Sequence, residues 1–250
     1  MNISNKTVLI TGGGSGIGLE IAKTLIAKGN KVIITGRNAD RLEKAASGLS
    51  NISTFAGDVT KEADVVKLVA YLNETHKTLD VVINNAGQAS LNQLGAEGSK
   101  SYDKASEEIL TNYLAVIRLN DALLPLLKQQ KEAAIVNVTS IVAIAPNVGI
   151  ATYAASKAAL HSYTQSLRYV LKATPVKVFE LYPPLVNTEF SAEIGGENGI
   201  PPSQVADEFI TGFEQDEFDI RVGFTAEFYK AFLASPGDAF VALNQARGHE

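Results

Sequence analysis

The sequence contains no cysteine and no tryptophan, and only one methionine and three histidines, among its 250 residues. Without cysteine the chain has no disulfide, no thiolate nucleophile and no cysteine-bound zinc. The histidines (His76, His161 and His249) are too far apart in sequence to suggest a His-x-x-x-His metal site, and no Ser-His-Asp triad is obvious. We therefore expect no metal site, and chemistry that comes from Tyr, Lys, Ser, Asp, Glu, Asn and a bound cofactor.

Long hydrophobic runs and basic runs are also missing. No apolar run approaches the ~20 residues that cross a bilayer, and the first residues do not form a charged-then-apolar leader. The 22 Lys and Arg residues against 27 Asp and Glu residues give a net charge of −5. This composition argues against nucleic-acid and membrane partners and predicts a cytoplasmic protein.

What the chain does have is an alternation of short apolar runs with longer helical patterns. The runs lie at residues 7–11, 31–35, 52–56, 81–83, 134–138 and 176–181, and helical spacing follows them, longest at 102–127 and 152–173. Continuous rather than alternating apolar strands indicate that both faces of the sheet are covered. The pattern predicts an α/β fold, a Rossmann-type doubly wound parallel sheet flanked by helices on both faces, in a single domain spanning residues 1–250.

Two segments depart from this rhythm. Residues 88–101 are predicted as a loop over the carboxyl ends of the strands. Residues 185–202 hold three glycines and two prolines, and the segment is long for a structureless loop in a compact domain. We interpret the region near 185–205 as a substrate lid. The tail from 223 to 250 is predicted as two short helices that separate at Pro236-Gly237.

A glycine-rich turn follows the first predicted strand and opens a helix, in the run Thr11-Gly12-Gly13-Gly14-Ser15-Gly16-Ile17-Gly18. Gly12 allows a tight turn, Gly16 lets the backbone approach a pyrophosphate, and Gly18 lets helix and strand pack closely. The amino end of the helix then offers free N–H groups to phosphates. There is no Gly-Lys-Ser/Thr, which excludes a P-loop nucleotide triphosphatase.

The end of the second strand bears on the choice between the two dinucleotides. A carboxylate there would hold the ribose hydroxyls of NAD, whereas an arginine would hold the 2′-phosphate of NADP. The sequence reads Thr35-Gly36-Arg37-Asn38, so NADP(H) is favoured, with NAD(H) left open because arginine also stacks on adenine.

Tyr153 and Lys157 lie four residues apart near the start of the second long helix, so they share one face. A phenol titrates near ~10 and is a poor acid–base group at neutral pH unless a neighbouring cation lowers its pKa. Ser140 ends the fifth strand and is expected to face the same crevice. The three residues together predict an acid–base site built on a tyrosine.

With these motifs the sequence resembles the compact branch of the short-chain dehydrogenase/reductase family, from about residue 7 to residue 188. The resemblance implies a catalytic tetrad of Asn112, Ser140, Tyr153 and Lys157. It also implies cofactor contacts from the following residues: Gly12, Gly14, Ser15, Gly16, Ile17, Gly18, Arg37, Asp58, Val59, Asn85, Ala86, Gly87, Tyr153, Lys157, Pro183, Val186 and Thr188.

The mechanism that this resemblance implies is hydride transfer from a nicotinamide with Tyr153 as the proton donor. Lys157 would lower the pKa of Tyr153 and bind the nicotinamide ribose, Ser140 would orient the substrate oxygen, and Asn112 would anchor a water that relays protons.

The substrate pocket is expected from Ser140, Val142, Tyr153, Pro184, Leu185 and Phe190, with Gln88, Leu91, Leu94, Ile141 and Ile194 also on its wall. These side chains are mostly apolar and include no Arg or Lys, which points to a small neutral ketone or secondary alcohol.

Two departures from the family pattern stand out. Pro183-Pro184 replaces the usual Pro-Gly, which removes an N–H, and the run Pro183-Pro184-Leu185-Val186 is similar to that of the DltE-like bacterial oxidoreductases. The family's closing strand can only be residues 219–223, and extra helices follow it. We still expect a homodimer or homotetramer through the helices 102–127 and 152–173, although that strand normally contributes to the tetramer.

Two other functions compete with the reductase. A dinucleotide-sensing regulator on the same scaffold would need the glycine turn but not the tetrad. A nucleotide-sugar epimerase would need a longer chain and a differently spaced turn. The complete set Asn112, Ser140, Tyr153 and Lys157 favours a short-chain alcohol dehydrogenase or carbonyl reductase.

Overall fold

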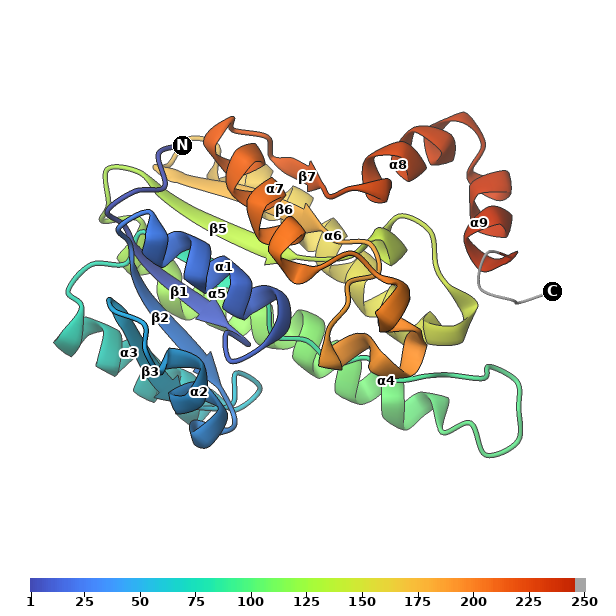
Figure 1. Ribbon diagram of the computed structural model, residues 1–250, viewed down its shortest axis with the longest axis horizontal. Coiled ribbons are helices and arrows are strands. Elements are labelled where there is room, and N and C mark those ends of the chain that lie inside the picture. The colour runs from blue at the N-terminus through green and yellow to red at the C-terminus, as the bar shows by residue number, and fades with distance from the viewer. Residues whose placement is uncertain (246–250) are drawn as a thin grey trace.

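A seven-stranded parallel sheet forms the centre of the protein, which we describe from a computed structural model covering residues 1–245. Its strand order is β3-β2-β1-β4-β5-β6-β7 (Figure 1). The strands are β1 (Thr7–Thr11), β2 (Lys31–Gly36), β3 (Ile52–Ala56), β4 (Val81–Asn84), β5 (Ala133–Val138), β6 (Val176–Tyr182) and β7 (Asp219–Arg221). The predicted doubly wound fold is confirmed, and the strand order reverses between β1 and β4, which is where such sheets bind ligands.

Helices cover both faces of this sheet. The α-helices of residues 1–245 are α1 (Gly16–Ala27), α2 (Ala39–Ala46), α3 (Glu62–Thr75), α4 (Ser101–Ile109), α5 (Ala115–Leu127), α6 (Ala151–Leu171), α7 (Pro202–Glu214), α8 (Phe224–Ala234) and α9 (Pro236–Gln245). Helices α1 and α7 lie side by side over one face, and α3, α5 and α6 cover the other. None of the helices within residues 1–245 is long and apolar enough to cross a membrane.

The inner residues of the strands are mostly apolar on both faces of the sheet because each face has its own core. Val8 and Ile10 of β1 point into the core beneath α1 and α7, whereas Leu9 between them points into the core beneath α3 and α5. All three side chains are fully buried. This burial explains why the strand pattern is continuous rather than alternating.

The long helix predicted at 102–127 is interrupted in its middle. Between α4 and α5 the chain forms a π-helical turn over Leu110–Leu114, with Asn112 buried inside it. The helix ends at Leu127, as predicted, and Pro125 lies inside its last turn. Turns of this kind widen the hydrogen-bond ladder by one residue and are frequent at functional sites.

The segment after β6 ends earlier than the bounds of 185–205 predicted for the lid. Two 3-10 turns (Glu189–Ile194 and Gly196–Asn198) fill it, and Val186 and Ile200 pair as an isolated parallel bridge. Residues 202–205 belong instead to α7, which begins at Pro202, a residue suited to the first turn of a helix.

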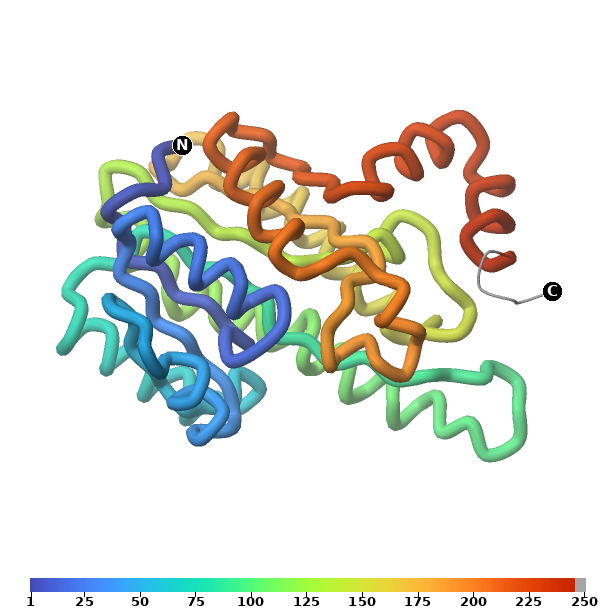
Figure 2. The backbone as a smooth tube through the Cα atoms, in the orientation of Figure 1, coloured from blue at the N-terminus to red at the C-terminus, as the bar shows by residue number. Residues whose placement is uncertain are grey.

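The tail forms two helices, as expected, and the second begins at Pro236 itself. Figure 2 traces the chain from β7 into α8 and α9, which lie beyond the β7 edge of the sheet. Asn244 of α9 donates to the carbonyl of Pro146 and accepts from the Val148 amide, so the tail is tied to the segment after β5. Residues 246–250, with His249 and the end of the predicted tail, lie outside the described residues.

Candidate active site

A cleft of about 480 Å³ opens along the carboxyl ends of the strands. Its walls come from the segments that follow β1 to β6, so residues far apart in sequence meet there. Of the predicted cofactor and pocket residues, the cleft is lined by Gly12, Gly14, Ser15, Gly16, Ile17, Arg37, Asp58, Val59, Asn85, Ala86, Gly87, Ser140, Val142, Tyr153, Lys157, Pro183, Pro184, Leu185, Val186, Thr188 and Phe190.

The glycine turn suits a pyrophosphate. Gly12 and Gly16 have φ values of +65° and +53°, a region that favours glycine. The amino end of α1 carries no acidic residue in its first turn, and its N-cap Ser15 makes no side-chain cap, so its first N–H groups stay available to an anion. The residues present therefore fit the diphosphate of a dinucleotide.

Gly18 lies behind the cleft wall rather than on it. A Cβ at this position would come within 2.6 Å of the Gly12 carbonyl oxygen and 2.5 Å of Asn85 Nδ2. Gly18 therefore allows α1 to pack closely against the glycine turn, as predicted. It is not itself on the wall of the cleft.

Two arginines lie at the end of the cleft that follows β2. Arg37 and Arg41 both line it, together with Asp58 and Val59 from the segment after β3. Arg41 also forms an exposed ion pair of 3.0 Å with Glu189, from the segment after β6. Arg41 is not among the predicted cofactor residues, although its spacing of four from Arg37 across the start of α2 was a usable signal.

The segment after β4 holds the glycine turn in place. Asn85 Nδ2 donates to the carbonyls of Thr11 and Gly12 at 3.0 and 3.1 Å, and the Ala86 amide donates to Thr11 Oγ1 at 3.0 Å. Asn85 therefore fixes the end of β1, while Ala86 and Gly87 form the wall of the cleft.

Ser140, Tyr153 and Lys157 meet at the other end of the cleft. All three are buried, and the Lys157 ammonium lies 5.6 Å from the centre of the Tyr153 ring. Lys157 Nζ donates to the Val138 carbonyl at 2.8 Å, which anchors it to the end of β5. Ser140 begins the turn after β5, where its Oγ accepts from the Val142 amide at 3.3 Å.

The pKa of Tyr153 shifts in the direction opposite to the one the sequence predicted. Burial raises the pKa of the phenol well above its usual range, while its hydrogen bond with Ser140 lowers it and the charge of Glu108 raises it further. Burial also lowers the pKa of Lys157 to about 8, and the charge of Glu180 raises it. The expectation that a neighbouring cation dominates is wrong for the residues of this chain alone, because the same burial weakens both charged forms.

Asn112 stands behind the catalytic residues, not on the wall of the cleft. Its Oδ1 accepts from the Gln88 amide, and its Nδ2 donates to the Gln88 carbonyl and to Ser156 Oγ at 2.8 to 2.9 Å. A Cβ on Gly87 would lie 3.3 Å from Asn112 Oδ1 and 3.8 Å from Lys157 Nζ, so the two side chains converge on one place.

The part of the cleft beside Tyr153 is mostly apolar. Val142, Pro184, Leu185 and Phe190 line it, as do Ile141, Ile150 and Ile194. Phe190 reaches it from the turn after β6, with its ring 6.1 Å from that of Tyr153.

Three of the expected wall residues lie elsewhere. Gln88 binds Asn112 and Glu107, and Leu91 and Leu94 are 47% and 59% exposed on the loop before α4. The placement of these three residues was wrong, because the Asn92 amide bonds to the Gly149 carbonyl and carries the loop past the cleft.

Comparison with known proteins identifies the family. The model of the short chain dehydrogenases matches residues 6–199. The chain belongs to this family. The match contains the glycine turn, Asn112, Ser140, Tyr153 and Lys157, so the resemblance seen in the sequence is confirmed.

Two bacterial relatives illustrate the similarity. The chain is 37% identical over 226 residues to an uncharacterized oxidoreductase of Bacillus subtilis (strain 168), DltE, covering 88% of this chain and 89% of that protein. It is 33% identical over 192 residues to the uncharacterized oxidoreductase SAR2567 of Staphylococcus aureus (strain MRSA252), covering 76% of this chain and 82% of that protein. The chain is therefore an oxidoreductase of this family.

Solved structures share the fold. A short chain dehydrogenase from Burkholderia cenocepacia in complex with NADP has a TM-score of 0.86 at 24% identity, over 97% of this chain and 99% of that one. A short chain dehydrogenase/reductase from Burkholderia phymatum in complex with NAD has a TM-score of 0.81 at 22% identity, over 88% and 89%. These neighbours hold the two dinucleotides on one fold.

Proposed function

We propose that this chain is an NADP(H)-dependent carbonyl reductase or alcohol dehydrogenase that acts on a small neutral ketone or secondary alcohol. The observation that carries the proposal is the convergence of Ser140, Tyr153 and Lys157 in the same cleft that the glycine turn lines. A bound nicotinamide supplies the hydride. A dinucleotide-sensing regulator would not need these three buried side chains beside the glycine turn.

Tyr153 is the proton donor of the proposed reaction. Burial keeps its phenol protonated at neutral pH, which suits reduction, where the hydroxyl gives its proton to the carbonyl oxygen. Ser140 holds the same oxygen by a hydrogen bond and stabilises the charge that develops on it. Lys157 brings a positive charge beside Tyr153 and replaces the lost proton, and Asn112 fixes the backbone at Gln88 that borders them.

NADP(H) is the proposed cofactor because Arg37 and Arg41 line the adenosine end and β2 ends without a carboxylate. Two guanidinium groups suit a 2′-phosphate. The competing proposal is an NAD(H)-preferring enzyme in which Arg37 stacks on adenine. Comparison of kcat/KM for NADPH and NADH separates them, and a higher value for NADH overturns the preference. Arg37→Ala is expected to reduce the preference by about tenfold or more, the effect of one charged contact.

The catalytic proposal is tested with Tyr153→Phe and a panel of neutral ketones, read by nicotinamide absorbance. Losing the proton donor is expected to lower kcat by about 10²–10⁴-fold while NADPH binding, measured by fluorescence titration, is retained. Reduction that persists in Tyr153→Phe would show that the proton comes from another group. Tight NADPH binding with no turnover of any ketone by the unaltered protein would favour the sensor instead.

Three further proposals concern the surroundings of the site. Residues 185–201 act as a substrate lid, so a deletion within 190–197 changes the KM of the ketone more than that of the cofactor.

The protein is a homodimer or homotetramer through the helices within 102–127 and 152–173, where Leu110, Leu114, Tyr169 and Val170 are exposed. It works in the cytoplasm. Light scattering after size exclusion measures the oligomer.

A further inference from the structure

Three polar side chains on α4 and the π-helical turn that follows it bind the backbone of the segment after β4. They occur at spacings of four residues, which places them on one face. We call this set the α4 polar row: Lys104, Glu108 and Asn112. In this order the three side chains bind the Leu91 carbonyl, the Ser90 amide and the backbone of Gln88. The helix and the segment therefore run in opposite directions, joined turn by turn through backbone groups.

Glu108, in the middle of the row, has no exposed surface. Its Oε1 accepts from the Ser90 amide at 2.7 Å, whereas its Oε2 is buried without a hydrogen-bond partner among residues 1–245. Burial raises the pKa of the Glu108 carboxyl, and its hydrogen bond with the Ser90 amide is among the contacts that lower it. A buried polar group with an unpartnered oxygen costs stability, so the contribution of this side chain lies in the segment that it holds.

The other side of this segment contacts the start of α6. Ala89 packs against the apolar cluster that contains Tyr153. Two residues beyond Ser90, the Asn92 amide donates to the Gly149 carbonyl at 2.8 Å, and Asn92 Nδ2 donates to Thr152 Oγ1 at 3.2 Å. Residues 88–92 therefore lie between α4 and the start of α6, in contact with both.

The segment begins at the wall of the cleft. Gly87 lines the cleft and directly precedes the first residue that the row binds. A Cβ on Gly87 would lie 3.3 Å from Asn112 Oδ1 and 3.8 Å from Lys157 Nζ, so the chain leaves the cleft where these two side chains converge. Asn112 fixes the position of one residue of the segment. A second anchor two residues further on fixes its direction as well.

We propose that Glu108 is a positioning residue, which holds the backbone after Gly87 against α4 and thereby fixes the cleft wall beside the catalytic lysine and tyrosine. The partner of Glu108 is a backbone amide, so the role needs a hydrogen-bond acceptor and not a negative charge. The inference rests on the proposed function for the reaction that is measured, but not for the placement of the segment.

The test compares Glu108→Gln, which keeps an acceptor, with Glu108→Leu, which is similar in size and has none. Glu107→Leu is the matched control, because Glu107 is exposed on the same helix and accepts from the side chain of Gln88 rather than from its backbone. Hydrogen exchange resolved by residue reports on the segment without substrate or cofactor. Ketone reduction and fluorescence titration with NADPH report on the cleft.

Glu108→Leu is expected to speed exchange of the Ser90 amide by about tenfold, the effect of one lost hydrogen bond. It is also expected to lower kcat by about tenfold, because a small displacement of the wall misplaces the reacting groups. The Kd of NADPH stays close to that of the unaltered protein, since the glycine turn is unchanged. Glu108→Gln is expected to restore both the exchange rate and kcat, and Glu107→Leu to change neither.

The unaltered protein provides a second measurement, which does not depend on whether Glu108→Leu folds. Its Ser90 amide is expected to exchange more slowly than the amide of Leu94, which is exposed on the same loop. Equal rates would show that the carboxyl group does not hold the segment, and would overturn the inference.

Three results with the variants also overturn it. In the first, Glu108→Leu behaves as Glu107→Leu does. In the second, exchange at Ser90 is faster but kcat is unchanged, so the segment does not place the wall. In the third, Glu108→Gln loses as much kcat as Glu108→Leu, which would make the charge and not the acceptor the important property. Faster exchange in Glu108→Leu, together with an unaltered protein that reduces no ketone, overturns the proposed function and leaves the placement of the segment standing.

Discussion

Helices α1 and α6 both lie on the sheet beside the cleft, but α6 adds directional polar contacts to its apolar ones. Helix α1 buries Ile21, Ala22 and Leu25, each with no exposed surface. Helix α6 presents Lys157, His161, Thr164 and Arg168 to strands β5 and β6. Apolar contact is not directional, whereas hydrogen bonds fix both distance and rotation.

The difference follows what each helix has to do. Helix α1 offers the backbone N–H groups of its first turn to an anion, and this interaction tolerates small shifts of the helix. Helix α6 carries Tyr153 and Lys157, whose chemistry depends on the placement of single atoms, and small misplacements there reduce rates strongly. We expect changes on α1 to reduce stability, and changes on α6 to alter the reaction as well.

The largest expected effect on stability comes from the apolar contact of α1. Leu25→Ala removes a fully buried side chain and leaves a cavity, which is expected to lower the free energy of unfolding by about 2–5 kcal/mol. The kcat per folded molecule stays unchanged. Denaturant unfolding and assays normalised to folded protein measure both. A large fall in kcat would contradict the distinction between the helices.

A smaller loss of stability with a change in rate is expected on α6. Thr164→Val keeps the shape of the side chain but leaves Asn137 Nδ2 without its acceptor in the core, at a cost of about 1–3 kcal/mol. Because α6 then loses a directional contact, kcat falls as well. Ser162→Ala, on the exposed side of the same helix, is the control and is expected to change neither quantity. Equal kcat for both variants would show that this contact does not place the catalytic residues.

The smallest effect is a pH dependence at His161. Since Glu180 raises its pKa in the folded state, protonated His161 stabilises the fold fully below the unfolded pKa of about 6.5, and this contribution is lost as the pH rises through the folded pKa. The stability difference between the unaltered protein and His161→Gln is therefore expected to shrink from pH 6 upward. Urea unfolding at several pH values measures it. A difference that does not change with pH would exclude this source of stability.

The strands, the glycine turn and most of the cleft could be predicted because their signals are local. A β-branched run that ends in Gly12-Gly13-Gly14 leaves few alternatives, and Tyr153 and Lys157 share a face by spacing alone. The π-helical turn at Asn112 could not be predicted, because it inserts one residue into a helical pattern that remains continuous in sequence. The position of the loop at Leu91 depends on a contact with Gly149, far along the chain.

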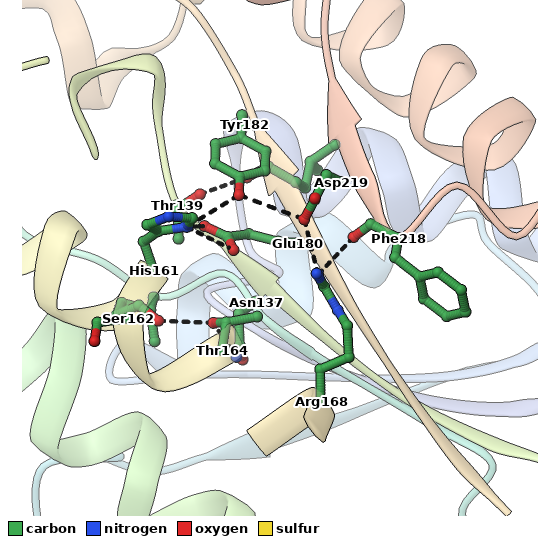
Figure 3. A network of polar contacts seen from close by, with 12 residues as sticks. Asn137, Thr139, His161, Ser162, Thr164, Arg168, Glu180, Tyr182, Phe218 and Asp219 are labelled. Carbon is green, nitrogen blue, oxygen red and sulfur yellow. Dashed lines mark hydrogen bonds and ion pairs between the residues drawn. The ribbon is translucent and has the colours of Figure 1, made fainter. Parts of the chain in front are cut away.

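The polar face of α6 could be predicted only in part. Its spacing is visible in the sequence at 157, 161, 164 and 168, but polar residues on a helix usually face water. Only the structure shows that Glu180 lies opposite (Figure 3), fully buried on β6, where the one other charged residue, Lys177, is partly exposed. A lone carboxylate within such a strand is the signal that a sequence analysis can use in other chains.

The bridge between Val186 and Ile200 closes residues 187–199 into a loop that could be replaced while the flanking chain is kept. The two ends of residues 187–199 are joined by hydrogen bonds from the Asn187 amide to the Ile200 carbonyl and from the Ile200 amide to the Leu185 carbonyl, so the chain passes from β6 to α7 across a closed loop. Loops closed in this way accept changes of length and sequence. The segment that carries Phe190 and Ile194 can be grafted from a relative as a cassette, which makes it the natural starting point for redesigning the substrate range on an unchanged catalytic frame.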